Sequence, residues 1–324
     1  MIITRSPLRI SLGGGGTDLP SYYEQYDGFC ISAAIDQYVY IALHNTTVNE
    51  IVLRYSQIEK VQNIKDIRHP IIKAALQLNN IINTNIELTS MANLPAGTGL
   101  GSSGSFTTAL LKALFRFKNK SISQHQLAEM ACHIEIDILK EPIGKQDQFI
   151  AAYGGLTSFE FKKDGQVIAK PINISNETIG RLEENLIMIP AGVSRSASEV
   201  LKEQNDKSKA ADPDMINNLH YVKEMGYRSL ELLESGNLVQ FGILMHEHWE
   251  HKKKRSTKMS NPYIDQIYQL CLENGAVGGK LIGAGASGFL LFYTEDKKQL
   301  LSTLKGAGLH DIKIKFDYEG TKIL

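Results

Sequence analysis

Alternating apolar and polar positions dominate the first half of the chain and predict β-strands. Leu8, Ile10 and Leu12 alternate with Arg9 and Ser11, which is typical of a strand with one buried face. Similar patterns predict strands at residues 30–35, 38–43, 51–55, 86–90 and 156–161. Helical spacing predicts helices at about 70–78, from 102 to about 114, and from Ser123 to about Ile138. This half is strand-rich first and helical later, so we expect an α+β fold with an antiparallel or mixed sheet.

A polar, turn-rich segment from residue 162 to about 184 predicts a boundary between two domains, 1–184 and 185–324. The second half opens with a buried strand at 185–189, and a helix is expected to begin within 192–198. Further elements are predicted as helices to about 254 and at 262–273, strands at 277–282 and 289–293, a helix at 297–305 and a strand at 312–316. This order predicts a second domain of β-α-α-β-β-α-β type.

Composition excludes several classes of function. The 324 residues include 35 basic and 35 acidic side chains, so no net charge favours nucleic acid or a membrane surface. Cys30, Cys132 and Cys271 are far apart in apolar surroundings, which is typical of reduced core thiols rather than of disulfides or zinc ligands. The N-terminus lacks the apolar stretch of a signal peptide, and the apolar run 281–293 is too short to cross a bilayer. We therefore expect a soluble, cytoplasmic protein.

The chemistry is expected to centre on the glycine-rich stretch at residues 94–106. Gly97, Gly99 and Gly101 alternate between a predicted strand and a predicted helix, and paired serines follow them. Backbone N–H groups of such a loop and the positive end of the helix dipole converge on one point, where a phosphate binds well. The stretch is not a Walker A loop, because serine and not lysine follows the last glycine. Ser102-Ser103 is expected to cap the helix that follows. The alternative to an anion site is an ordinary glycine-rich turn that opens a helix.

A second glycine run, residues 13–16, lies between Arg9 and Asp18. Four consecutive glycines let a backbone pass close to a ligand, while the cation suits a phosphate and the carboxylate suits sugar hydroxyls. The alternative is a wide glycine hairpin with both side chains solvated.

Two carboxylates in the middle of the chain are candidates for catalysis. Glu135 lies near the end of a predicted helix, and Asp147 follows a Pro-Gly break beside Lys145. Asp147 is a candidate general base, and Lys145 a cation that steadies its charge or the transferred phosphoryl group. Alternatively, Asp147 caps the next helix. Arg195, near the start of a predicted helix, is a candidate anion ligand or else a surface arginine.

Two further motifs do not support the functions that they first suggest. Gly283, Gly285 and Gly288 match G-x-G-x-x-G, but a strand follows instead of the helix that a dinucleotide site requires. A glycine turn between two antiparallel strands fits better. A set of three histidines would scatter around a helix and contains no HExxH motif, so solvated or packing roles are favoured over a metal site: His246, His248 and His251.

Together, the three glycine motifs resemble those of the GHMP kinases, a superfamily that includes galactokinase, homoserine kinase and mevalonate kinase. Residues 7–18 are similar to the first family motif, 94–105 to its P-x-x-x-G-L-G-S-S signature and 280–289 to its C-terminal glycine motif. Their order covers essentially the whole chain. Two departures are Gly104, where alanine is usual, and Ala286-Ser287, which replaces a glycine pair. The resemblance implies a two-domain α+β fold with a mixed N-terminal sheet and a ferredoxin-like C-terminal domain.

Within the superfamily, the chain most resembles the heptose 7-phosphate kinases. This likeness rests on Gly14-Gly15-Gly16-Thr17-Asp18, on residues 142–155, on residues 278–285, on Ser194-Arg195-Ser196 and on Trp249 with Lys252. It implies ATP and Mg²⁺ as cofactors and transfer of a phosphoryl group to the anomeric hydroxyl of D-glycero-D-manno-heptose 7-phosphate. The 1,7-bisphosphate would serve nucleotide-activated heptose and surface polysaccharide synthesis. Partners would be small molecules, not nucleic acid or membrane, and a homodimer is left open.

The resemblance also implies roles for individual residues. Asp147 would accept the hydroxyl proton, with Arg9 and Lys145 as catalytic cations, while Ser103 (with Ser102 as the second choice) and Glu135 would place the metal. ATP would be held by Pro95, Gly97, Thr98, Gly99, Leu100, Gly101, Ser102 and Ser103. The substrate would be bound by Arg9, Thr17, Asp18, Arg195, Lys252 and Gly285.

Three alternatives remain open at this stage. The first is a free-sugar 1-kinase of the fucokinase kind. A substrate that already carries a phosphate would need extra cations, for which Arg195 and Lys252 are the candidates, whereas a free sugar would not need them. A non-catalytic, ligand-sensing relative is disfavoured because Arg9, Asp18, Ser103, Glu135 and Asp147 are all present. A nicotinamide oxidoreductase is weakened by the missing helix after Gly288.

Overall fold

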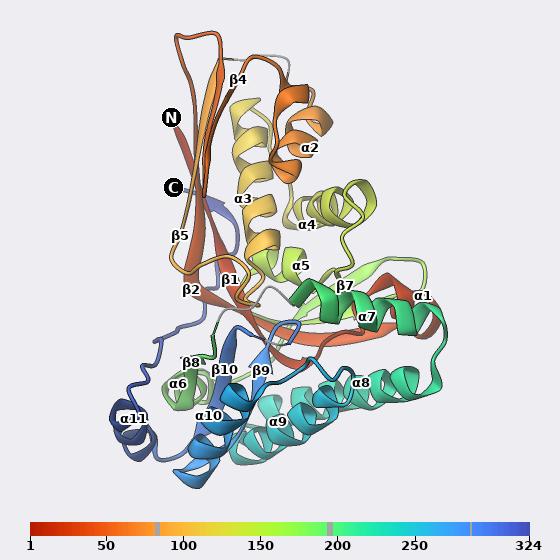
Figure 1. Cartoon of the computed structure of the whole chain (residues 1–324), viewed down its shortest axis with the longest axis vertical. Coiled ribbons are helices and arrows are strands. Elements are labelled where there is room, and N and C mark those ends of the chain that lie inside the picture. Colours follow the sequence, from red (N-terminus) through yellow and green to blue (C-terminus); the bar gives the residue numbers. More distant parts are fainter. Residues whose placement is uncertain (82–84, 193–196, 286) are drawn as a thin grey trace.

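A computed structural model describes residues 1–81, 85–192, 197–285 and 287–324, and shows two sheets with helices packed on them (Figure 1). The larger sheet has the strand order β11-β1-β2-β5-β3-β4, and β6 and β7 extend it from the other end of β2. Only β3 and β5 pair in parallel among the described strands. Its strands are β1 (Ile2–Gly14), β2 (Gly28–Asn45), β3 (Ile51–Arg54), β4 (Ile58–Val61), β5 (Ile86–Ala92), β6 (Leu156–Phe161), β7 (Val167–Pro171) and β11 (Lys322–Ile323).

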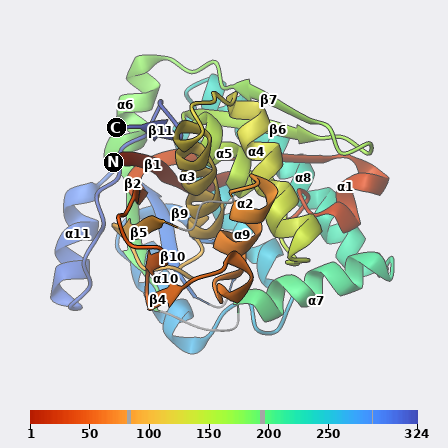
Figure 2. The same cartoon turned by 90° about the horizontal axis from the view of Figure 1, so that it is seen from above.

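Helices of the first half cover one face of this sheet (Figure 1; Figure 2 shows the same arrangement from above). They are α2 (Pro70–Leu78), α3 (Ser102–Phe117), α4 (Gln124–Cys132) and α5 (Gln146–Tyr153), with the π-helical turn His133–Ile138 after α4. A short 3₁₀ turn (Ile64–Asp66) precedes α2, and α1 (Pro20–Tyr26) joins β1 to β2. Buried apolar residues of α3, such as Leu110 and Leu114, share one core with Ile41 and Leu43 of β2. Because α3 packs on β1 and β2, its N-terminus is held at a fixed place above the sheet.

The smaller sheet is antiparallel, with the order β8-β10-β9. It contains β8 (Leu186–Pro190), β9 (Ala276–Ile282) and β10 (Phe289–Thr294). The helices of this part are α6 (Asn176–Asn185), α7 (Ala197–Lys209), α8 (Pro213–Glu234), α9 (Leu238–Lys253), α10 (Pro262–Glu273) and α11 (Lys297–Gly306). Helix α8 also packs on β1 and α9 on β9, so the two halves share a core that includes Leu12, Phe241 and Leu291. This shared core brings the glycine loops of both halves together.

The structure corrects two predictions about strands and adds three strands that were not predicted. Residues 30–35 and 38–43 form one strand, because Asp36 and Gln37 are bulged where Pro7 pairs with Tyr38 and Leu8 with Ile35. Residues 312–316 form no strand. Ile312 instead bridges to Met188 and Phe316 to Ile35, so this segment links the two sheets. Strands β4 and β7 were not predicted. Strand β11 was not predicted either: it lies in the part of the chain expected to form the second domain, but it pairs with β1 of the larger sheet. The smaller sheet therefore has three described strands and not four.

Candidate active site

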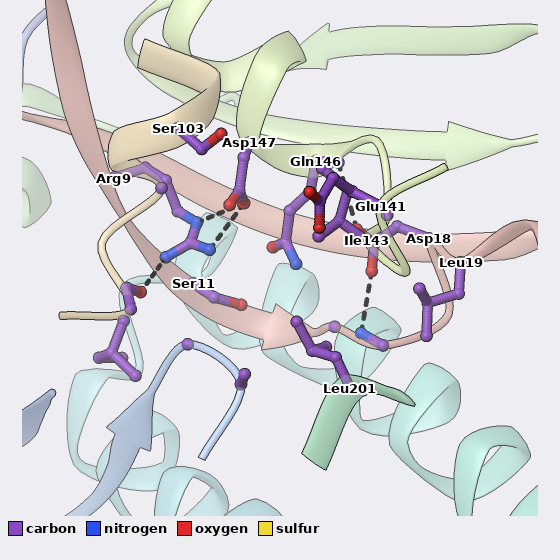
Figure 3. Close-up of a pocket in the computed structure, with 18 of the residues that line it drawn as sticks. Arg9, Ser11, Asp18, Leu19, Ser103, Glu141, Ile143, Gln146, Asp147 and Leu201 are labelled. Carbon is purple, nitrogen blue, oxygen red and sulfur yellow. Dashed lines mark hydrogen bonds and ion pairs between the residues drawn. The ribbon is translucent and has the colours of Figure 1, made fainter. Parts of the chain in front are cut away.

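One cavity of about 610 Å³ lies where the two halves of the fold meet. Its walls come from the end of β1, the glycine run after it, the loop before α3, the segment 141–147, helices α7 and α9, and the turn after β9. Figure 3 shows Arg9, Asp18, Ser103 and Asp147 pointing toward this space from four separate segments, with Leu201 of α7 facing them. Residues far apart in sequence thus converge on one site.

The central glycine loop forms the cavity wall at the N-terminus of α3. Gly97, Gly99 and Gly101 all have φ between 74° and 77°, a conformation that favours glycine. Gly101 is the N-cap residue, and Ser102 and Ser103 occupy the first turn. Capping by Ser102 is therefore wrong, because the left-handed Gly101 leaves the first backbone N–H groups without a side-chain cap. N–H groups without a side-chain cap, together with the positive end of the helix dipole, are the features that can hold an anion.

The residues predicted to bind ATP divide into two groups. Gly97, Gly99, Gly101, Ser102 and Ser103 line the cavity. The others shape the loop: the Thr98 hydroxyl donates to the Pro95 carbonyl oxygen at 2.9 Å, and Leu100 is fully buried while its carbonyl accepts from the Arg9 N–H.

The third glycine motif, Gly283 to Gly288, packs against this loop on the side of Thr98 and Gly99. A Cβ at Gly283 would lie 2.5 Å from the Gly99 Cα, and one at Gly288 would overlap the Thr98 carbonyl oxygen. Strand β10 follows Gly288, which confirms the predicted turn between antiparallel strands and excludes a dinucleotide fingerprint here. Gly283 also lines the cavity, but Gly285 does not and packs instead against Met259.

Arg9 and Asp147 form an ion pair at the centre of the site (Figure 3). The Arg9 Nε donates to Asp147 Oδ1 at 2.8 Å, and the Arg9 Nη2 lies 2.6 Å from the same oxygen. Another guanidinium nitrogen of Arg9 donates to the Gly99 carbonyl, which ties β1 to the glycine loop. Among the described residues, Asp147 Oδ2 has no hydrogen-bond donor, so this oxygen is available to a ligand hydroxyl.

Lys145 does not pair with Asp147, contrary to the prediction. Its ammonium donates to the Gly165 carbonyl at 2.7 Å and lies 5.1 Å from the centre of the Tyr23 ring. Lys145 is the N-cap residue of α5, so its side chain leaves on a different side of the chain from the Asp147 side chain. It lines a neighbouring cavity rather than the one that contains Arg9. The catalytic role predicted for Lys145 is therefore not supported by its position.

Ser103 and Glu135 lie side by side, as the metal prediction requires. The Ser103 hydroxyl donates to Glu135 Oε2, and the Gln148 amide donates to Oε1 at 3.0 Å. Burial raises the pKa of the Glu135 carboxyl, which these hydrogen bonds partly offset. A hydroxyl and a carboxylate beside an anion site fit Mg²⁺, which usually takes one or two protein oxygens and completes its shell with phosphates and water. The described residues contain no cluster of three or more His, Cys, Asp or Glu side chains that could hold a metal ion by themselves.

Asp18 holds the first glycine run in place and faces the cavity. Its Oδ1 accepts from the Gly16 N–H at 3.0 Å and its Oδ2 from the Gln146 N–H at 3.2 Å (Figure 3). Burial and, secondarily, the charge of Asp147 raise the pKa of the Asp18 carboxyl. Thr17 is different: its hydroxyl is fully buried and exchanges hydrogen bonds with the Phe29 backbone. Thr17 therefore supports the loop and does not face the cavity.

A glycine beside Asp18 provides a local test of this geometry. A Cβ at Gly144 would overlap the Asp18 carboxylate, and nothing about its backbone φ requires glycine. We expect Gly144→Ala to displace Asp18 and raise the KM for the phosphoryl acceptor about tenfold, with a smaller change in the KM for ATP. Gly180→Ala is the matched control, because a Cβ there would meet nothing within 4 Å. Equal acceptor KM values for the parent and Gly144→Ala would exclude Asp18 from acceptor binding.

The remaining predicted ligands lie in the C-terminal half. Lys252 of α9 lines the cavity and is buried, and its ammonium donates to the carbonyls of Leu281 and Gly283. Arg195 lies outside the described residues. Three basic side chains that line the cavity were not predicted as ligands: His248, Arg255 and Lys280. His248 is buried, His246 bonds Tyr268 and His251 stacks on Tyr221, which supports packing roles over a metal site. Lys280 could have been noticed, because it interrupts an apolar strand.

Within the described parts of the chain, no helix combines the length and apolar character needed to cross a bilayer.

Comparisons with known proteins bear on the family of this chain. Residues 69–155 match the family model of the GHMP kinases N terminal domain, and residues 229–308 match that of the GHMP kinases C terminal domain. A D-glycero-alpha-D-manno-heptose 7-phosphate kinase from Campylobacter jejuni is 28% identical over 99% of this chain and 98% of its own. A bifunctional fucokinase/GDP-fucose pyrophosphorylase from Arabidopsis thaliana is 25% identical over 95% of this chain and 31% of its own.

Solved structures show the same fold. A D-glycero-D-manno-heptose 1-phosphate kinase from Bacteroides thetaiotaomicron superposes with a TM-score of 0.81 at 22% identity, covering 100% of this chain and 99% of its own. The mevalonate kinase of Methanococcus jannaschii gives a TM-score of 0.74 at 23% identity over 97% and 98% of the two chains. With both family models matched in order and a two-part α+β fold shared along the whole chain, this protein belongs to the GHMP kinase family, whose members are ATP-dependent phosphotransferases.

Proposed function

We propose that this protein phosphorylates the anomeric hydroxyl of D-glycero-D-manno-heptose 7-phosphate with ATP, giving the 1,7-bisphosphate. The observation that carries the kinase part is the position of Asp147, in one cavity with the N-terminus of α3 and with Asp18. A carboxylate between an anion site and a hydroxyl-binding carboxylate is placed to take a proton from an acceptor hydroxyl. The product would supply nucleotide-activated heptose for surface polysaccharide synthesis.

The mechanism that we infer uses the residues of the chain mainly for positioning and charge. Backbone N–H groups of the loop before α3 hold the phosphates of ATP, and Asp18 orients the sugar. The acceptor hydroxyl gives its proton to Asp147 Oδ2 while its oxygen bonds to the γ-phosphorus and ADP leaves. Arg9 offsets the charge of Asp147 and lies beside the transferred group. Ser103 and Glu135 would hold Mg²⁺, which when bound neutralises charge on the phosphates.

The choice of sugar rests on the Campylobacter jejuni relative, which is similar along the whole chain, and on cations beside the acceptor site. A free-sugar 1-kinase is the second candidate, since two fucokinase-containing enzymes are also similar. A ligand-sensing relative without catalysis is less well supported, because Arg9, Asp18, Ser103, Glu135 and Asp147 all line one cavity.

A substrate panel separates these candidates. We expect heptose- or sedoheptulose-type 7-phosphates to exceed fucose, galactose and other free hexoses by at least about 100-fold in kcat/KM, measured as ADP release. A site with buried polar groups that bind a phosphate discriminates against a substrate without one, because those groups are then left unpaired. Arg195→Glu should narrow this margin. If fucose or galactose is the best substrate, the heptose assignment is wrong while family membership stands. If no sugar is phosphorylated under any condition, the ligand-sensing alternative is favoured.

A further inference from the structure

Three cations of the C-terminal half meet at one wall of the cavity and are almost fully buried. They are Lys252 at the end of α9, Arg255 just after it and Lys280 on β9, with exposed fractions of 9%, 4% and 3%. Lysine and arginine are rarely buried to this extent unless they are paired with an opposite charge. Their position in the wall of a cavity therefore needs an explanation.

The described residues give these cations only uncharged partners. Lys252 donates to two backbone carbonyls, and Arg255 donates to the side chains of Asn218 and Gln204 and to the Gly15 carbonyl. Lys280 has the weakest contacts, since its ammonium lies 3.4 Å from the His248 Nδ1 and has no other hydrogen-bond partner among the described residues. An ammonium has three donors, so Lys280 keeps donors free for a ligand in the cavity.

The electrostatics indicate the kind of ligand. Burial, together with the charge of Arg255, lowers the pKa of the Lys280 ammonium to about 7, and burial with the charge of Lys280 lowers the pKa of Lys252 well below its usual value. Burial also holds the pKa of neighbouring His248 well below its usual value, so this histidine is neutral at pH 7. Like charges crowded in a low-dielectric wall are costly without an anion, and a bound dianion would restore the charged ammonium groups.

Arg255 places the cluster beside the first glycine run, while Lys252 also donates to Gly283, which packs against Gly99 of the nucleotide loop. Arg255 donates to the carbonyl of Gly15, in the glycine run that Asp18 holds, and the charge of Asp18 partly offsets the burial that lowers the pKa of Arg255 to about 10. The cluster thus borders the acceptor side of the cavity. The loop before α3 has its own N–H groups for the phosphates of ATP.

We propose that Lys280, Arg255 and Lys252 form a binding site for a phosphate monoester carried by the acceptor, with Lys280 as its principal donor. The site would select a phosphorylated sugar over the same sugar without phosphate. This proposal deepens the proposed function and depends on it only for the identity of the sugar. Both the acceptor and ATP carry phosphate groups that this site could bind, so the experiments below distinguish the two ligands.

The main test compares Lys280→Met with the parent on heptose 7-phosphate and on the same heptose without phosphate. Loss of a charge-assisted contact should lower kcat/KM for the phosphorylated sugar about 10- to 100-fold, and lower it much less for the free sugar. Lys280→Arg should recover part of the preference, while the KM for ATP should change less than threefold. Lys254→Met is the matched control, because Lys254 lies between Lys252 and Arg255 of the cluster but has an exposed side chain.

Binding of inorganic phosphate gives a readout independent of turnover. In the absence of ATP, phosphate should raise the melting temperature of the parent and of Lys254→Met but not that of Lys280→Met, with all three melting normally in phosphate-free buffer. Phosphate should also compete with the sugar phosphate and not with ATP. Three results would each overturn the proposal. The first is an equal loss of kcat/KM on both sugars in Lys280→Met, the second a raised KM for ATP with an unchanged sugar preference. The third is a parent protein that phosphate does not stabilise. If phosphate stabilises the parent but no sugar is phosphorylated, the site stands and the proposed function fails.

Discussion

Replacing Asp147 with asparagine is expected to lower kcat by about 10²- to 10⁴-fold while leaving the fold and ATP affinity in place. Asparagine keeps the size of the side chain and an oxygen that can accept from the Arg9 Nε. It cannot take up the proton of an attacking hydroxyl. The substitution therefore tests the base and its charge and not the packing around them.

The measurement is kcat together with thermal melting and ATP binding for both proteins. The structure already weakens the capping alternative, since Lys145 is the N-cap of α5 and Asp147 lies within its first turn. Asp214 is the matched control, because it lies at the second position of α8 as Asp147 does in α5, but is exposed. Asp214→Asn should retain full turnover. Turnover of Asp147→Asn within a few-fold of the parent would place the base elsewhere.

Removal of divalent cations is expected to lower turnover by at least about 100-fold. Metal ions contribute several kcal/mol by neutralising charge on transferring phosphates, and each 1.36 kcal/mol is a tenfold change in rate. We expect excess chelator to abolish ADP release and added Mg²⁺ to restore it. Undiminished turnover in chelator would exclude the metal assignment.

The variant Glu135→Gln tests whether Glu135 is a ligand of the Mg²⁺ ion that turnover is expected to require. The amide cannot supply a negative oxygen, so we expect a higher Mg²⁺ concentration at half-maximal activity. Because burial raises the pKa of the Glu135 carboxyl, its protonated, non-ligating form accumulates at a higher pH than for an exposed glutamate. The Mg²⁺ requirement of the parent should therefore increase as the pH is lowered, and Glu135→Gln should lose this dependence. Glu129→Gln, on the exposed side of α4, is the control and should behave as the parent. A Glu135→Gln enzyme with the Mg²⁺ requirement of the parent would remove Glu135 from the metal site.

Much of the fold and the site could be predicted from the sequence because the signals are local. Helices α2 and α10 begin and end where apolar spacing and proline at the first position place them, and Ser123 caps α4 through a capping box. The alternating glycines 97, 99 and 101 have left-handed φ values that few other residues adopt, so their pattern alone indicated a loop able to bind an anion. Each of these features depends on residues within a few positions of one another.

Only the tertiary structure decided which distant side chains meet. Lys145 is two residues from Asp147 but bonds Gly165, while Arg9, 138 positions away, forms the ion pair. Lys280 and Arg255 reach the cavity because α9 packs on β9, and residues 312–316 bridge both sheets instead of forming a strand. A buried charge takes its partner from whatever the packing of sheets and helices brings within a few ångströms. Spacing along the chain carries no information about that packing, so these contacts could not be predicted from the sequence alone.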